Sequence, residues 1–227
     1  MKNQTVINAT IQEQVYRILR EEIVDRKYQE GDQLKEAEIA QRFNISRSPV
    51  REALYRLAGD GILTIIPNRG IFVKEFTDKY IMDALDMRYM LEERGLSRAG
   101  QNMTEAVRGQ LLEMRGQMQA LVDQNDTTLE KHSALDGEFH DYIMERNDNT
   151  FVREVAEKIA VLNSMFIFIS LEDPARAIES QMQHIAIIDN LLAGDTEQAI
   201  AVYQEHIRGT KKRVVEEFEL RRNARRQ

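Results

Sequence analysis

The chain has 227 residues, of which 42% are hydrophobic, and this length allows one large domain or two small ones. No apolar run approaches the roughly 20 residues that a membrane-spanning helix needs, and the opening residues MKNQTVINATIQEQ lack the apolar core of a signal peptide. Because cysteine is absent, disulfides and thiolate metal ligands are excluded. Taken together, these three observations lead us to expect a soluble cytoplasmic protein.

The net charge of −7 is unevenly divided along the chain. Residues 1–76 carry 12 Lys and Arg against 11 Asp and Glu, whereas residues 77–227 carry 19 against 27. The segment FNISRSPVREALYR nevertheless holds three arginines and only one glutamate. The charge therefore supports DNA binding only locally, and a dimer would help by doubling the phosphate contacts.

Two helices are predicted before this arginine-rich segment. Residues 10–27 place apolar side chains at helical spacing behind Thr10, a good N-cap, and KEAEIAQRF forms a second, shorter helix. A loop containing Gly31 separates the two helices, and NIS forms a tight turn into a third helix. Three helices with a short turn before the last one follow the helix-turn-helix plan.

The third helix, residues 47–58, has the composition of a DNA recognition helix. Pro49 lies in its first turn, where a missing N–H costs nothing, so Ser46 is the predicted N-cap. Arg47, Ser48 and Arg51 gather at the helix start, where free backbone N–H groups also suit phosphates and base edges. The apolar residues of this helix are expected on its buried side: Val50, Ala53, Leu54 and Leu57.

A two-stranded hairpin is predicted next, from the runs ILTII and IFVKEF with PNRG between them. Directly after a recognition helix, such a hairpin is the wing of a winged helix. Arg69 and Gly70 would lie at its tip, where an arginine can enter a minor groove or contact a phosphate. The alternative is an exposed arginine on an ordinary surface hairpin, and the position after the helix favours the wing.

Only helices are predicted from Thr77 onward, because the strand patterns end there. Thr77, Thr104, Thr127 and Asp173 are good helix starts. The predicted fold is mostly α, with a winged helix-turn-helix domain at 1–76 and an all-α antiparallel helical bundle at 77–227. The helices of the bundle are expected near residues 78–99, 104–123, 127–146, 150–170, 175–193 and 196–220.

One aspartate and three histidines of the second domain have spacings that suit a metal site. Asp136 and His140 are four residues apart on one helix face, and His184 and His206 lie on the apolar faces of two other helices. Converging inside a bundle, they could bind a borderline divalent ion such as Zn²⁺, Ni²⁺, Mn²⁺ or Fe²⁺. The spacing leaves the alternatives open, namely hydrogen-bonded core histidines and a surface Asp–His pair.

Arg88 lies among apolar residues of the first helix of this domain and could bind a carboxylate through two of its nitrogens. The alternatives are a pair with Glu92, four residues later, or a plain surface arginine. On the residues alone, these alternatives are favoured. No segment resembles a phosphate-binding glycine loop or a nucleophile elbow.

Over roughly residues 10–217 the sequence resembles the GntR family of bacterial transcription regulators. SRSPVREAL and the PNRG wing are specific features of its winged helix. DMRYMLEERGLSRAG, DGEFHDYIM, QHIAIIDNLLAGDTEQAI and EHI resemble the helical effector domain of its FadR-like branch, the FCD domain. The resemblance implies that the DNA contacts are made by Ser46, Arg47, Ser48 and Arg51.

For the helical domain, the resemblance implies a divalent metal, with zinc favoured over nickel, manganese or iron. It also implies a small carboxylate effector, with Arg88 as a contact. Many relatives carry an arginine where this chain has Ala37, so that DNA contact is either lost or replaced by Lys35. The metal ligands that it implies are Asp136, His140, His184 and His206.

The expected function is therefore a ligand-responsive repressor that acts as a homodimer on a short palindrome in double-stranded DNA, away from membranes. One alternative is a regulator for which the metal ion itself is the signal. A less favoured alternative is a mononuclear Asp/His metalloenzyme. That alternative does not explain SRSPVREAL or the wing, and the sequence places no obvious general base beside the ligands.

Overall fold

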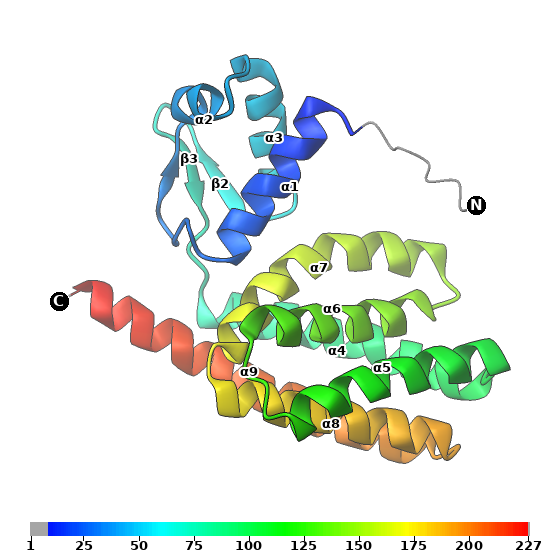
Figure 1. The fold of residues 1–227 in the computed structure, drawn as a ribbon. Helices are drawn as coiled ribbons and strands as arrows, with labels where there is room; N and C mark the ends of the chain where they lie inside the picture. Colours follow the sequence, from blue (N-terminus) through cyan, green and yellow to red (C-terminus); the bar gives the residue numbers. More distant parts are fainter. Residues whose placement is uncertain (1–8, 227) are drawn as a thin grey trace. The chain divides into compact units, whose positions relative to one another are not determined.

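The computed structural model describes residues 9–226, apart from the side chains of Arg153, Glu157, Lys158, Arg225 and Arg226 (Figure 1). The chain forms two compact units, Met1–Phe76 and Thr77–Gln227. The first eight residues of the expected first domain lie outside the described residues. Within residues 9–226, no helix is long and apolar enough to cross a membrane.

The first unit contains three helices within the described residues, α1 (Ile11–Val24), α2 (Glu36–Phe43) and α3 (Arg47–Gly59). Thr10 caps α1 by accepting a hydrogen bond from the amide of Glu13 at 3.2 Å. Asn44 ends α2 in the left-handed conformation, with φ at 54°, and so makes the tight turn into α3. The side chains of α3 that the sequence predicts to be buried are buried, as expected: Val50, Ala53, Leu54 and Leu57.

A three-stranded antiparallel sheet completes the first unit, with strand order β1–β3–β2. The sequence predicts only its hairpin, β2 (Leu63–Ile66) and β3 (Gly70–Val73), and misses β1 (Gln33–Leu34). In β1, Gln33 pairs with Phe72 and Leu34 with Ile71. A strand of two residues is too short to show an alternation of apolar and polar side chains. It is identified only by its pairing with the edge of β3 that β2 leaves free.

The second unit consists of six helices within the described residues: α4 (Asp78–Gln101), α5 (Glu105–Asp123), α6 (Leu129–Glu145), α7 (Thr150–Leu171), α8 (Pro174–Leu192) and α9 (Thr196–Arg226). Side-chain caps at Thr77, Thr104 and Asp173 begin three of them, as predicted. The predicted start at Thr127 is wrong by one residue, since Thr128 is the N-cap of α6. The last helix is also longer than predicted and continues to residue 226.

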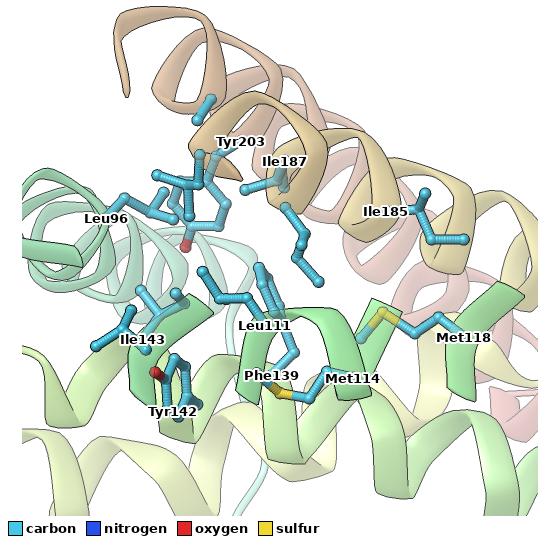
Figure 2. Packing of buried hydrophobic residues seen from close by; sticks show 14 of the residues in the cluster. Leu96, Leu111, Met114, Met118, Phe139, Tyr142, Ile143, Ile185, Ile187 and Tyr203 are labelled. Carbon is cyan, nitrogen blue, oxygen red and sulfur yellow. The ribbon is translucent and has the colours of Figure 1, made fainter. Parts of the chain in front are cut away.

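An apolar cluster built from α4, α5, α6, α8 and α9 holds the second unit together (Figure 2). Phe139 of α6 and Tyr203 of α9 are its largest fully buried side chains. Gly95 brings α4 close to α6, because a Cβ at this position would collide with the carbonyl oxygen of Ile143. The polar residues described next lie one and two turns earlier on the same two helices, so this close approach brings them together.

Candidate metal centre and DNA-binding surface

Three histidines from three helices converge in the interior of the second unit. His140 of α6, His184 of α8 and His206 of α9 are 4%, 0% and 2% exposed. The Nε2 atom of His184 lies 3.1 Å from that of His140 and 3.4 Å from that of His206. The three rings could together hold a metal ion, each offering one nitrogen.

The outer contacts of two of these rings determine which nitrogens face inward. His140 donates from Nδ1 to Glu92 Oε2 at 2.5 Å, and His206 donates from Nδ1 to Gln183 Oε1 at 2.7 Å. The amide nitrogen of Gln183 donates to Glu179 at 3.5 Å, which supports this orientation of the amide. Because neutral imidazole has one N–H, the Nε2 atoms of His140 and His206 are bare lone pairs.

These bare nitrogens fit a bound cation. His184 can supply at most one N–H, so the three facing Nε2 atoms cannot satisfy one another by hydrogen bonds alone. The other nitrogen of His184, Nδ1, has no hydrogen-bond partner in the part of the chain that the structure describes. Burial, above all, lowers the pKa of all three histidines well below the usual range, which keeps them in the neutral form that binds metals.

Asp136, the fourth predicted ligand, lies beside the three histidines. Its Oδ1 atom is 3.8 Å from His140 Nε2 and 3.7 Å from His184 Nε2, and it accepts a hydrogen bond from Ser180 at 3.5 Å. Burial raises the pKa of Asp136 to about 6, against the opposing attraction of Arg88. The carboxylate is thus within reach of an ion held by the histidines.

Arg88 is buried rather than on the surface, and its Nε donates to Glu92 at 2.8 Å. This is the pairing that the sequence offered as an alternative to effector binding. The guanidinium also lies 3.9 Å from Asp136, and its Nη1 has no partner within residues 9–226. The residue therefore pairs with Glu92 and still presents an unused donor near the histidines.

Glu92 is the shared hydrogen-bond acceptor beside the three histidines, whereas the sequence suggested it only as a partner of Arg88. It accepts hydrogen bonds from Arg88 Nε, from His140 Nδ1 and from the hydroxyl of Tyr203, the last at 2.7 Å. Burial raises the pKa of Glu92, whereas Arg88 and Tyr203 act in the opposite direction. Its spacing of four residues from a buried arginine was the signal that could have revealed it.

His132, the remaining histidine, is fully buried but is not among the three converging rings. Its Nε2 lies 2.6 Å from the carbonyl oxygen of Asp126. Although His132 is four residues before Asp136, this contact turns its ring toward the start of α6. Its omission from the predicted ligand set agrees with this geometry.

The predicted DNA-contacting residues lie exposed at the start of α3 and at the hairpin tip. Ser46 occupies the N-cap position, but its side chain makes no capping hydrogen bond within the described residues. Arg51 pairs with Glu36 of α2, and Lys35, the suggested substitute for an arginine at position 37, pairs with Glu38 at 2.8 Å. The exposed residues of the set are Ser46, Arg47, Ser48, Arg51 and Arg69.

The hairpin tip depends on Gly70, whose φ is 119°. A Cβ at this position would lie 2.6 Å from Gln33 Nε2, which donates to the carbonyl oxygen of Arg69 at 2.9 Å. A glycine at position 70 therefore leaves room for Gln33 of β1 to donate its hydrogen bond to the hairpin tip. The side chain of Arg69 is left exposed above it.

Comparison with known proteins decides the class of this molecule. Residues 11–73 match the model of the bacterial regulatory proteins of the gntR family, and residues 83–209 match the FCD domain. The chain belongs to the GntR family and carries an FCD domain of the FadR-like branch. It is therefore a transcription regulator and not an enzyme, which removes the metalloenzyme alternative.

Characterised relatives and solved structures agree with this assignment. The HTH-type transcriptional repressor RspR of Escherichia coli is 27% identical over 209 residues, which cover 91% of each chain. The gluconate operon transcriptional repressor of Bacillus subtilis is 29% identical over 172 residues, covering 76% of this chain and 69% of the relative. The structure of E. coli McbR/YncC has a similar fold, with a TM-score of 0.75 at 22% identity over 92% of this chain and 99% of the other.

Proposed function

We propose that this regulator is a homodimeric repressor that binds a short palindrome in double-stranded DNA. Each α3 helix reads one half-site in the major groove, where Ser46, Arg47, Ser48 and Arg51 contact bases and phosphates. Arg69 and Gly70 of each wing contact the adjacent minor groove or backbone. The exposure of the arginines supports this role, and two relatives bear the name of repressors.

We further propose that Asp136, His140, His184 and His206 bind one divalent metal ion. The observation that carries this proposal is the convergence of imidazole nitrogens from three histidines. Without an ion, the lone pairs of the facing nitrogens repel one another, whereas a cation placed between them would be bound by all three rings. Zinc suits three imidazoles and one carboxylate best, and nickel, manganese or iron fit the same donor set. Two of the rings, those of His140 and His206, donate hydrogen bonds to Glu92 and Gln183, and these bonds hold the rings in the orientation that the ion needs.

A small carboxylate effector binds beside this ion, with Arg88 as its contact. The unused Nη1 of Arg88 supports this role. With both carboxyl groups ionised, the net charge of the buried side chains of Arg88, Glu92 and Asp136 is −1. A bound divalent ion changes this net charge to +1. A carboxylate is thus attracted only when the metal is present, and by linkage it shifts the population of dimers that can bind DNA.

Titrations on the full-length protein test this proposal. Operator duplexes selected from a random library are bound at constant salt, with metal or chelator and with or without a panel of organic acids. Arg51→Ala is expected to weaken operator binding, and unchanged affinity would contradict the role of α3. The variant His184→Ala plus His206→Ala is expected to lose bound metal in elemental analysis, and full occupancy would contradict the site.

The same titrations test the alternative in which the metal ion itself is the signal. A carboxylate sensor responds to an acid at saturating metal, and a metal sensor responds to the ion alone. The unused donor of Arg88 favours the carboxylate sensor, because a metal sensor has no need of a buried cation near its ion. A response to metal with none to any acid would favour the alternative.

A further inference from the structure

The guanidinium of Arg51 is held by a carboxylate from the neighbouring helix. Glu36, the first residue of α2, accepts hydrogen bonds from Arg51 Nε at 3.0 and 3.1 Å and from Nη2 at 2.8 Å. Both side chains remain accessible to solvent, with 55% of Arg51 and 26% of Glu36 exposed. The pair thus favours one orientation of an arginine that we assign to DNA, before any DNA binds.

The geometry of this pair leaves one edge of the guanidinium free. A guanidinium is planar and has two edges that can donate two parallel hydrogen bonds. Glu36 occupies the edge formed by Nε and Nη2, so the edge formed by Nη1 and Nη2 remains for a ligand. Two acceptors with matching spacing occur on guanine, where O6 and N7 lie side by side in the major groove.

The charge of Glu36 decides between guanine and phosphate as the partner of this edge. A phosphate at Arg51 would also approach the Glu36 carboxylate, and the two anions would repel each other. A guanine edge is neutral and meets no such repulsion. Arg47, one turn earlier in α3, is exposed and makes no hydrogen bond or close ion pair in the described part of the chain, and although its charge is also attracted by Glu36, its own donors remain open to a phosphate.

We propose that Glu36 is a specificity-determining residue, which orients Arg51 toward a guanine of the operator and prevents it from binding phosphates instead. The pair also fixes the side-chain rotamers in advance, which lowers the entropy cost of forming the specific contact. This inference rests on the proposed role of α3 as the reader of the operator. It adds a residue of α2 that does not itself contact the base.

The chain offers a matched control in the same turn of α2. Glu38 pairs with Lys35 at 2.8 Å, is 67% exposed and makes no hydrogen bond or ion pair with Arg51 among the described residues. Glu36→Gln and Glu38→Gln therefore remove the same charge from nearly the same place. Only the first variant releases Arg51.

The experiment measures base preference at every operator position. An operator is selected with the full-length wild type, and binding of each variant to all single-base-pair changes and to one random duplex is then measured at several salt concentrations. Glu36→Gln is expected to reduce the preference for guanine at one position by about tenfold, the order of one bidentate arginine–guanine contact. It should also bind the random duplex more tightly, with a salt slope steeper by about one.

The control variants make the expected pattern specific. Glu38→Gln releases Lys35, so it should strengthen binding to both duplexes, but it should leave the guanine preference assigned to Arg51 intact. Arg51→Lys, which keeps the charge but lacks the planar fork, should lose the same guanine preference as Glu36→Gln. Adding Glu36→Gln to Arg51→Lys should change the preference no further, because the two residues act through one contact.

Three results would overturn the inference. In the first, Glu36→Gln keeps every base preference, whatever its affinity. In the second, its profile equals that of Glu38→Gln. In the third, Glu36→Ala, used if Glu36→Gln does not fold, keeps the guanine preference although it has no carboxylate to orient Arg51. A wild type that selects no sequence would instead contradict the proposed function, so the two failures are distinguishable.

Discussion

The arginine–glutamate pairs at the two candidate sites, Arg51–Glu36 in the first unit and Arg88–Glu92 in the second, lie in opposite environments. Arg51 and Glu36 are 55% and 26% exposed, whereas Arg88 and Glu92 are 3% and 2% exposed. An exposed pair is screened by water and salt, so it contributes little to stability and can take part in a new contact. A buried pair is costly to break, because the charge left behind would lie alone in the interior.

The comparison shows how the same chemistry serves two purposes. The exposed pair orients an arginine that faces solvent, where DNA can reach it. The buried pair is extended by His140 and Tyr203, which link Glu92 of α4 to α6 and α9. A change in the position of His140 is therefore transmitted through the Glu92 carboxylate to α4 and α9. The following predictions test this difference between the two pairs.

The largest effect is expected when one partner of the buried pair is removed. Glu92→Ala leaves Arg88 without its carboxylate and His140 without its acceptor, and should lower the free energy of unfolding by about 3–5 kcal/mol. The measurement is urea unfolding of the metal-free protein. The matched change Glu36→Ala should leave the free energy of unfolding almost unchanged, because its pair is exposed to solvent.

Equal losses in the two variants would contradict the comparison. So would a Glu92→Ala variant as stable as the wild type. The contrast can be sharpened with Glu92→Gln, which keeps the size of the side chain and removes its charge. It should be less destabilising than Glu92→Ala and should still weaken metal binding, by about 10- to 100-fold, because the amide is a poorer acceptor for His140.

Removing the metal should have the next largest effect. With free zinc a thousandfold above its dissociation constant, binding adds about 4 kcal/mol to the stability of the folded state. Chelator treatment should therefore lower the melting temperature, and added zinc should restore it. In the variant His184→Ala plus His206→Ala, neither treatment should change the melting temperature.

His132→Gln is the control for this measurement. The change is destabilising because His132 is buried, but it leaves the three converging rings intact. The variant should melt earlier than the wild type and keep the same difference between the metal-bound and metal-free protein. A chelator response that is lost in His132→Gln, or kept in the double variant, would show that the ion binds elsewhere.

The smallest effect is expected at the wing. Arg69→Ala should weaken binding to the selected operator by a few-fold and reduce the salt slope by about one, since a single cation is removed from the contact. Stability should not change, because this side chain is exposed. Arg208→Ala, which removes an exposed arginine of the second unit, should change neither quantity, and a loss equal to that of Arg69→Ala would contradict the role of the wing.

Much of the fold followed from local patterns. The apolar spacing and the capping residues located every helix, since a helix satisfies its own backbone and shows its buried face in a period of 3.6 residues. The misses concern features without such a pattern. The strand β1 has only two residues, and the end of α9, which continues to residue 226, contacts a distant part of the chain through the ion pair of Arg221 with Glu172.

The candidate sites show the same limit of prediction from local sequence patterns. Spacing alone could suggest Asp136 and His140 as neighbours, because i and i+4 share a helix face. It could not show that His184 and His206 meet them, nor choose between pairing with Glu92 and effector binding for Arg88. Those answers needed the packing of α4, α6, α8 and α9 around one interior, which Gly95 helps to bring together.

By itself, the sequence determined the class of the protein, its mostly helical fold and the residue types at both sites, since motifs and helical periodicity are local properties of a chain. Tertiary structure alone decided which atoms face one another. It placed bare nitrogens together at the candidate metal centre, made Glu92 their shared support and set Glu36 beside Arg51. The physical reason is that charge and hydrogen-bond geometry depend on distances between helices far apart in sequence, which no local pattern encodes.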